Sequence, residues 1–223
     1  MNEKSVLQNN NCPDSFATSG AAVYSSGGIL KVFGSTIKNN SNNHSSNFGG
    51  AIYIKNGTLN ITSGTFEENK TNKNGGAIYV TEGTVNITGG NFINNKVSTG
   101  SNKTETSYGG GAIYIDSAET SISAATFESN ITEDGVGTLL ITNIGTETSP
   151  AMIYNCTFTN NTAYQKGAAI YTGGTSYIEI NDCTFTGNTL SIDGSHDVYI
   201  GNTGGTTKIN GSAMTGAWTS SSN

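Results

Sequence analysis

The chain has 223 residues, which is within the range that one all-β domain can fill. Only 12% of the residues are charged and 30 are glycine, but Ile, Val, Tyr and Phe recur at fixed places, and this favours a packed core over disorder. The formal net charge is −6 and the chain has no arginine, so a nucleic acid or an anionic membrane is a poor partner, because each attracts a basic patch.

One structural unit can be followed in chain order from residue 49. The word GGAIYI at 49–54 predicts a strand entered through a bend, because glycine tolerates backbone angles that other residues resist. A turn follows, and LNI at 59–61 predicts a second short strand. TF at 65–66 predicts a third strand, which ends in a turn at Asn69. Apolar and polar residues alternate within each segment, as is typical of half-buried strands.

The same unit recurs along the whole chain. GGAIYV at 75–80 and GGAIYI at 110–115 repeat the first strand. The word F-x-x-N repeats the third, with six anchor residues at Ile37, Phe66, Phe92, Phe127, Phe158 and Phe185. Five residues before the anchors stand Val32, Ile61, Ile87, Ile122, Ile153 and Ile180. Three residues after them stand Asn40, Asn69, Asn95, Asn130, Asn161 and Asn188.

Three short strands per repeat of about 26–31 residues predict an all-β fold, a single-stranded right-handed parallel β-helix (solenoid) of about seven rungs. We expect a single domain over residues 1–223, with regular rungs from about 20 to 214. Leu7 falls at an anchor position near the start, and KINGSAM at 208–214 predicts a further turn with Met214 as its anchor. We therefore expect a segment of a longer surface protein, with its secretion signal and its anchor outside this sequence.

Stacking gives each repeated column a physical role. An asparagine column in a solenoid predicts a ladder of amide hydrogen bonds, which holds the rungs in register. In the word GGAIY the isoleucine points inward and the tyrosine outward, so the tyrosines predict an exposed aromatic strip, interrupted at Leu140. Such a strip favours stacking on sugar rings or anchoring a protein interface, and simple strand propensity is the alternative. The candidate ligand-binding residues are Tyr24, Tyr53, Tyr79, Tyr114, Tyr171 and Tyr199.

Cys156 and Cys183 occupy one column of small residues in neighbouring rungs, so a disulfide between them is possible, although we favour two small buried thiols. Asp193, His196 and Asp197 lie in one polar turn and come nearest to a metal constellation, with a solvated loop as the preferred interpretation. We expect no metal and no cofactor.

The words GGAI and F-x-x-N, repeated in a chain rich in Gly, Asn and Ser, resemble the repeats of chlamydial polymorphic membrane proteins and related bacterial adhesins. The resemblance covers about residues 20–200. It implies a non-catalytic, adhesin-like passenger of an autotransporter, exposed at the cell surface or secreted. The partner would then be a protein or glycan of a host or neighbouring cell, contacted through the tyrosine strip or through the long segments at 96–108 and 128–150.

Two other functions remain open. A structural spacer, or a subunit that self-associates end to end, would use the open strand edges at the ends of the helix. A polysaccharide-active enzyme or carbohydrate-binding module is the third possibility. Glycoside hydrolysis needs two carboxylates about 5–9.5 Å apart, however, and Asp116, Asp134, Asp182, Asp193 and Asp197 share no column.

Overall fold

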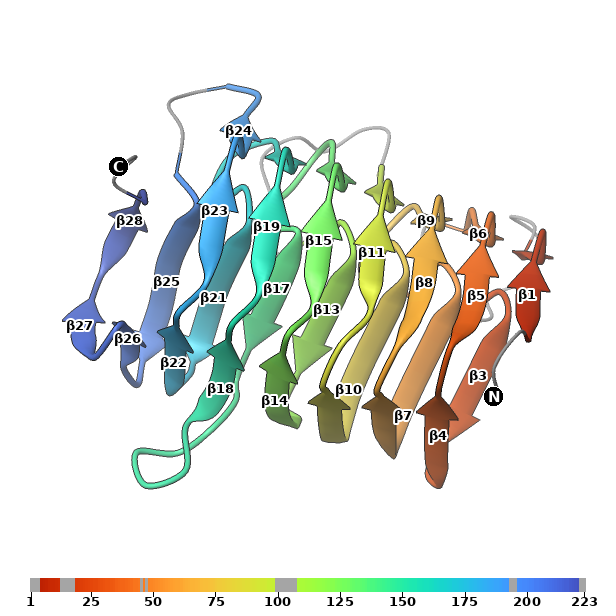
Figure 1. The fold of residues 1–223 in the computed structure, drawn as a ribbon, viewed down its shortest axis with the longest axis horizontal. Helices are drawn as coiled ribbons and strands as arrows, with labels where there is room; N and C mark the ends of the chain where they lie inside the picture. Colours follow the sequence, from red (N-terminus) through yellow and green to blue (C-terminus); the bar gives the residue numbers. More distant parts are fainter. Residues whose placement is uncertain are drawn as a thin grey trace.

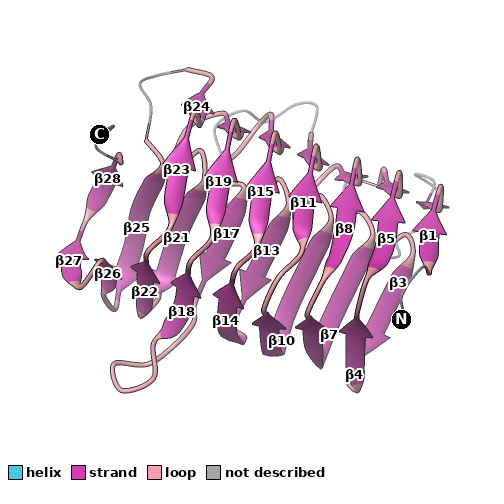
Figure 2. Cartoon of the chain, in the orientation of Figure 1, coloured by secondary structure: helices cyan, strands magenta, loops and turns pink. Residues whose placement is uncertain are grey.

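The fold is a β-solenoid of about six turns, shown in Figure 1 for a computed structural model. The structure describes residues 5–12, 19–44, 46, 48–98, 108–192 and 196–220. Strands joined by loops and turns make up this described part, with no helix in it (Figure 2). Accordingly, none of these residues forms a helix that could span a membrane.

Three sheets run along the solenoid. The first has seven strands, namely β1 (Val6–Gln8), β5 (Ser35–Lys38), β8 (Gly64–Glu67), β11 (Asn91–Ile93), β15 (Thr126–Glu128), β19 (Thr157–Thr159) and β23 (Thr184–Thr186). The second also has seven, namely β2 (Asn11–Cys12), β6 (Ser41–Asn42), β9 (Lys70–Thr71), β12 (Lys96–Val97), β16 (Ile131–Thr132), β20 (Thr162–Ala163) and β24 (Thr189–Leu190). Seven stacked strands in each of these sheets correspond to about six turns, against the about seven rungs that the sequence predicts.

The third and largest sheet has fourteen strands and carries the tyrosines. Its members are β3 (Val23–Ser26), β4 (Ile29–Val32), β7 (Ile52–Ile61), β10 (Ile78–Ile87), β13 (Ile113–Asp116), β14 (Glu119–Ser123), β17 (Leu139–Thr142), β18 (Ala151–Tyr154), β21 (Ile170–Thr175), β22 (Ile178–Asn181), β25 (Val198–Gly204), β26 (Thr207–Ile209), β27 (Ser212–Met214) and β28 (Gly216–Trp218). The first two predicted strands of a unit merge into one long strand in β7 and in β10, which pair in parallel and in register from Ile52↔Ile78 to Ile61↔Ile87.

The predicted apolar columns form the core. Ring centroids of successive anchor phenylalanines, from Phe66 to Phe185, lie 4.6–5.3 Å apart, with planes within 11° of parallel. Phe66, Phe92, Phe127 and Phe158 are fully buried. Burying each such side chain stabilises the fold by roughly 1.5–3 kcal/mol from area alone.

The asparagine ladder is present in every predicted turn. Each Nδ2 donates to the Oδ1 of the next asparagine at 2.8–3.0 Å, from Asn10 through Asn40, Asn69, Asn95, Asn130 and Asn161 to Asn188. From Asn69 onward, each Nδ2 also donates to the carbonyl of the anchor residue one turn back, as Asn95 does to Phe66 at 2.8 Å. The residue before the ladder position is left-handed in several turns, for example Glu68 with φ 53°. The ladder therefore satisfies a buried row of amides at the corner and fixes the register of the rungs.

Each of the two paired glycines is required for a different structural reason. Gly75 has φ +70°, where a side chain would meet the Ile78 carbonyl. Gly76 has an ordinary φ, but a Cβ on it would lie 1.9 Å from the Gly111 carbonyl of the next turn. The first glycine makes the bend, and the second allows two backbones to approach closely.

The two ends of the chain differ from each other. At the start, Leu7 pairs with Ile37, as expected for an anchor position. At the other end Ile209 aligns with Ile180 as predicted, but the predicted anchor role of Met214 is wrong. β27 turns back and runs antiparallel to β26, with Met214 opposite Thr207, and β28 runs antiparallel to β25. These two strands cover the C-terminal edge of the large sheet (Figure 1).

Candidate functional site

The candidate tyrosines do form one column on the large sheet. In-register pairs link Tyr24 to Tyr53, Tyr53 to Tyr79, and Tyr79 to Tyr114. Leu140 continues the column, followed by Tyr171 and Tyr199. The predicted alignment and its interruption at Leu140 are therefore confirmed.

The predicted exposure of this column is wrong for most of its length. Tyr24 is 57% exposed, but Tyr79 is 8% and Tyr171 is 7% exposed. Tyr53 and Tyr114 are half-buried. The column is therefore exposed at Tyr24, buried at Tyr79, Leu140 and Tyr171, and half-buried at its other tyrosines.

The cause is a ladder of backbone bridges that covers the outer face of the column. It links Phe48, Asn74, Gly109, Val136 and Lys166, one residue per turn, each shortly before the strand that carries the column residue. In the middle of the molecule Val136 packs with Leu140 and Tyr171 into a small apolar cluster outside the main core. The segments that precede the GGAIY words therefore shield the tyrosines from solvent.

At the N-terminal end four rings form what we call the aromatic platform: Tyr24, Phe48, Tyr53 and Tyr79. Tyr53 stacks between Tyr24 and Tyr79, with both centroid distances 5.4 Å. Phe48 lies against Tyr79 at 4.5 Å and against Tyr53 at 6.2 Å. The Nζ of Lys73 lies 4.5 Å from the Phe48 centroid, which is cation–π geometry. The platform thus combines stacked rings, partly open to solvent, with one adjacent cation.

Burial has an electrostatic consequence for these phenols. Burial, followed by the neighbouring Tyr114 and Asp116, raises the pKa of Tyr79 well above its ordinary value near 10. Burial and the neighbouring Tyr24 raise the pKa of Tyr53 in the same direction. Both rings are therefore neutral at physiological pH, and the platform offers uncharged aromatic faces.

A polar network lies beside Tyr114, between the platform and the C-terminal tyrosines. The Thr142 hydroxyl lies 3.2 Å from the Tyr114 oxygen and donates to Oδ1 of Asp116 at 2.8 Å. Asn143 donates to the same carboxylate oxygen at 2.9 Å. The Asp116 carboxylate is therefore hydrogen-bonded by two neighbouring side chains of the fold.

Tyr171 and Tyr199 stack at 5.7 Å beyond this network. Gly201 leaves room for the first ring, because a Cβ there would lie 2.3 Å from the Tyr171 oxygen. The Nζ of Lys166 lies 4.6 Å from the centroid of Tyr199. This pair is more enclosed than the platform, since Tyr171 is buried.

Cys156 and Cys183 are free thiols that lie in adjacent turns, with Thr184 N donating to the Cys156 carbonyl at 2.9 Å. The Cys156 thiol donates to the Tyr154 carbonyl at 3.4 Å, and Cys183 makes the equivalent contact with Asn181. The hydrogen bond with Cys183 and burial together raise the pKa of the Cys156 thiol. Cys156 is therefore held as a protonated thiol in the column of small residues.

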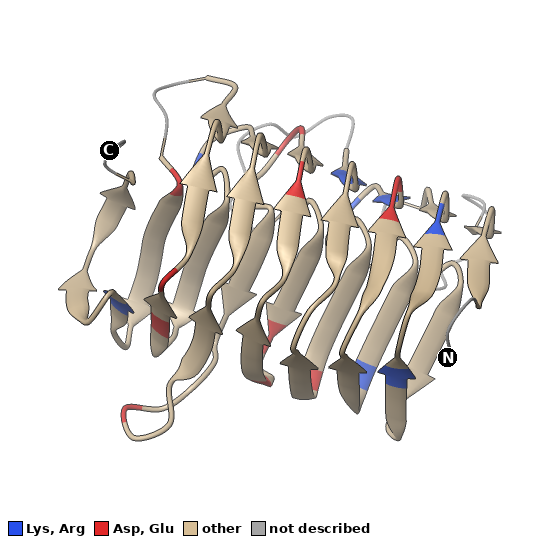
Figure 3. Cartoon of the chain, in the orientation of Figure 1, with Lys and Arg blue, Asp and Glu red and all other residues tan. Residues whose placement is uncertain are grey.

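The acidic residues do not converge. Figure 3 shows the described Asp and Glu positions spread over several turns of the backbone. Asp193 of the candidate metal turn lies outside the described residues, His196 is half-buried, and both carboxylate oxygens of Asp197 accept hydrogen bonds from protein groups. Within the described ranges, three His, Cys, Asp or Glu side chains nowhere gather as a metal site would require. The long segment at 96–108 lies largely outside the described residues, whereas the one at 128–150 is described in full.

Comparison with known families gives three matches along the chain. The family described as the Chlamydia polymorphic membrane protein (Chlamydia_PMP) repeat matches residues 35–55, 63–81 and 155–173. Three segments of the chain are therefore similar to the polymorphic membrane protein repeat. No curated protein and no solved structure matches.

Each matched polymorphic membrane protein repeat corresponds to one defined part of a turn. It begins near the anchor strand, passes through the ladder asparagine and ends on the strand that carries the column tyrosine. The match at 63–81, for example, includes Phe66, Asn69 and Tyr79. Each matched segment therefore contains an apolar core anchor, a corner asparagine and a column tyrosine in one continuous stretch.

Sequence reasoning missed Phe48 and Lys73, which complete the platform. A weak signal exists for the first, because Phe48 and Tyr108 both stand directly before a glycine run. In the other turns of this chain the positions that correspond to Phe48 are Asn74, Gly109, Val136 and Lys166, none of them aromatic, so Phe48 falls outside the repeated words. Lys73 does not belong to a column of repeated lysines, so its contact with Phe48 is recognised only in the folded structure.

Proposed function

We propose that this chain is a non-catalytic, adhesin-like module that attaches to host or neighbouring-cell surfaces through the aromatic platform. The observation that carries the proposal is the partly open stack of Tyr24, Tyr53 and Phe48 at one end of an otherwise shielded column. Uncharged aromatic faces bind the apolar faces of sugars and anchor protein interfaces, where Tyr and Trp are enriched among energetically dominant residues.

The repeat family and the solenoid fold support this proposal. Polymorphic membrane protein repeats and a β-solenoid are what a surface-exposed autotransporter passenger would contain. An extracellular or cell-surface location follows as part of the proposal. The partner would be a protein or a glycan of the opposing cell.

The alternative of an end-to-end filament is less well supported. Stacking through parallel strands would need open edges at both ends of the solenoid. β27 and β28 run antiparallel along the C-terminal edge of the large sheet, and Trp218 lies edge-on against Phe185 at 5.5 Å. A second copy would have to displace these contacts before it could pair there.

Saturation binding of labelled chain to epithelial cells tests the proposal. The platform variant Tyr24→Ser/Phe48→Ser/Tyr53→Ser removes the three accessible rings and leaves the buried Tyr79 in place. Tyr154→Ser is the matched control, because Tyr154 is 43% exposed and lies outside the platform. Loss of binding in the platform variant alone would support the proposal, and equal binding by all three proteins would refute it.

A further inference from the structure

A hydrogen-bonded loop projects from the solenoid where β17 connects to β18 (Figure 1). Ile144 at its base is 2% exposed, and its carbonyl accepts a hydrogen bond from the Tyr177 backbone at 2.8 Å. At its tip, Thr146 and Ser149 exchange backbone hydrogen bonds of 2.9 and 3.2 Å. The Thr146 hydroxyl oxygen also accepts from the backbone N–H of Ser149 at 3.0 Å. These contacts give the loop a defined shape before any ligand is present.

A groove of about 280 Å³ lies between this loop and the outer face of the large sheet. Its floor is built from β10 and β14, where Thr84 pairs with Glu119 and Asn86 pairs with Ser121. Pro150 from the loop also lines it. The volume lies just below the roughly 300–1,000 Å³ typical of small-molecule sites, which suits a ligand of one or two sugar rings.

We propose that this groove binds a neutral saccharide. Hydroxyl, amide and carboxylate groups from two neighbouring strands, about 4.8 Å apart, face the groove. The Asn86 amide is oriented by donating to Asn60 at 3.1 Å, which leaves its oxygen free to accept. Glu119 and Ser121 form no side-chain hydrogen bond with any described residue. These groups match the mixed donors and acceptors of sugar hydroxyls.

Two further features of the lining select the ligand class. Pro150 and Met152 supply apolar surface against which the C–H face of a sugar ring can pack. Glu119 is the charged residue of the lining, and no lysine contributes to it. An anionic sugar or a phosphate would therefore meet repulsion without a compensating cation.

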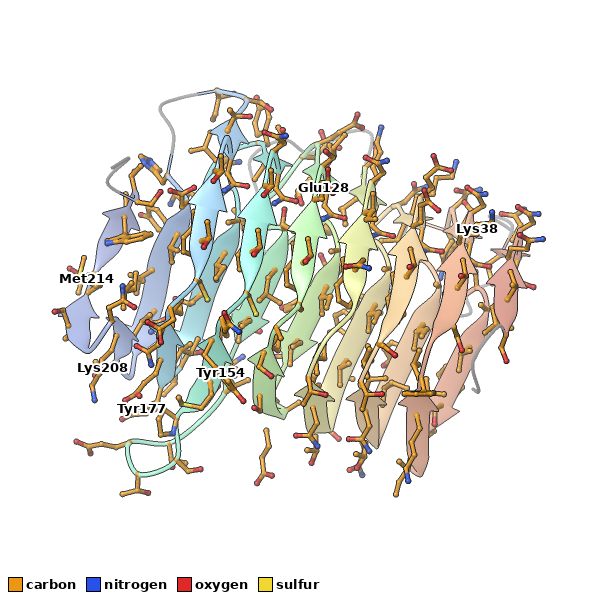
Figure 4. All side chains as sticks on the ribbon, viewed as in Figure 1. Lys38, Glu128, Tyr154, Tyr177, Lys208 and Met214 are labelled. Carbon is orange, nitrogen blue, oxygen red and sulfur yellow. The ribbon has the colours of Figure 1, made fainter. Side chains whose placement is uncertain are left out.

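A smaller hollow on the other side of the loop shares Pro150 and is lined by Tyr177 and Lys208 (Figure 4). Lys208 there pairs with Glu179 at 3.1 Å, so its charge is already partnered. The groove beside β10 and β14 is the larger of the two, and it lies away from the column that carries the aromatic platform. Saccharide binding in the groove is a second activity, independent of whether the platform binds cells.

The test is saturation-transfer NMR and titration of the purified chain with a panel of neutral mono- and disaccharides, alongside a sialylated trisaccharide. Ser121→Phe fills the groove, and Thr65→Phe is the matched control, since both positions are half-buried and face outward on different sheets. Glu119→Gln changes the lining with little change in shape. Thermal unfolding of each variant checks that the fold is intact.

We expect at least one neutral saccharide to bind, with affinity lowered at least about tenfold in Ser121→Phe and unchanged in Thr65→Phe. Glu119→Gln should weaken binding by a smaller factor, and this result decides the matter if Ser121→Phe fails to fold. Absence of binding by every neutral saccharide overturns the proposal, and so does a preference for the sialylated sugar or binding that survives in both groove variants. Cell attachment by the platform is measured separately, so the two proposals can fail independently.

Discussion

Asn188 donates its Nδ2–H to Oδ1 of Asp197 at 3.0 Å, whereas each earlier amide in the ladder donates to another asparagine. The other oxygen of Asp197 accepts from the backbone N–H and the hydroxyl of Ser220, both at 2.8 Å. A carboxylate has no donor to leave unpaired, so it ends a one-directional ladder without an unsatisfied group. The same side chain ties the segment after β28 to the last turn.

Replacing Asp197 should loosen this end of the solenoid. In Asp197→Ala the Ser220 groups and one Asn188 donor lose their acceptor, and an unsatisfied buried group costs about 1–3 kcal/mol. We expect the free energy of unfolding in urea to fall by about that amount. Asp182→Asn, at an exposed position, should change it by less than about 0.5 kcal/mol. Equal stabilities for the two variants would mean that Asp197 has no structural role.

Substitution of a ladder asparagine inside the stack should lower the free energy of unfolding more than substitution of Asp197. Asn95 accepts from two groups of Asn69 and donates to Asn130 and to the Phe66 carbonyl. Asn95→Ala should therefore cost at least about 3 kcal/mol. Asn95→Asp should cost more, because it places a buried carboxylate against two acceptor oxygens.

Asn86→Ala is the control for the ladder, since Asn86 makes a similar amide contact with Asn60 on the exposed face. It should lower stability by less than about 0.5 kcal/mol in the same urea unfolding experiment. A loss as large as that of Asn95→Ala would show that amide pairing, and not burial of the ladder, determines the cost.

Gly76 should not tolerate a methyl group. A Cβ at this position would lie 1.9 Å from a backbone carbonyl of the next turn, so Gly76→Ala must separate two rungs. We expect loss of the cooperative unfolding transition seen by circular dichroism. Gly28→Ala, with φ +75° and open space around it, should cost only the backbone strain of about 1–2 kcal/mol. If both variants unfold alike, turn-to-turn contact is not the reason for the second glycine.

Tyr79 should make the fold sensitive to alkaline pH. Its pKa is raised in the folded state, first by burial, so the folded chain holds the phenol proton more tightly than the unfolded chain. The resulting stabilisation is fully present below about pH 10 and is lost as the pH rises above that value. In Tyr79→Phe the unfolding free energy should fall less steeply between about pH 9 and pH 11 than in the unchanged chain. Parallel curves for the two proteins would contradict the buried state of this ring.

The core and the ladder could be predicted from the sequence because a stack repeats the same environment at the same interval. Phe66 and Asn69 each face a copy of themselves in the next turn, so their spacing already contains the register. The covering of the tyrosines could not be predicted in this way. Phe48, Val136 and Lys166 occupy equivalent places in the fold, but they share no side-chain chemistry and no repeated word.

The reversal at the C-terminal end had a signal that the repeat pattern obscured. Asn210 and Gly211 have φ values of 47° and 80°, and Asn-Gly between two short strands is typical of a tight hairpin. The alignment of Ile209 with the isoleucine column favoured a further turn instead. The groove beside the loop at 143–150 could not be predicted from the sequence either, because folding brings its residues together from β10, β14 and the loop.

The most direct test of the account is the dissociation constant of the labelled chain on epithelial cells, measured for the unchanged protein, the platform variant and Tyr154→Ser. Loss of three accessible rings should weaken saturable binding at least about tenfold, while Tyr154→Ser binds like the unchanged chain. Binding by a folded platform variant with an unchanged dissociation constant would contradict the proposed role of the platform.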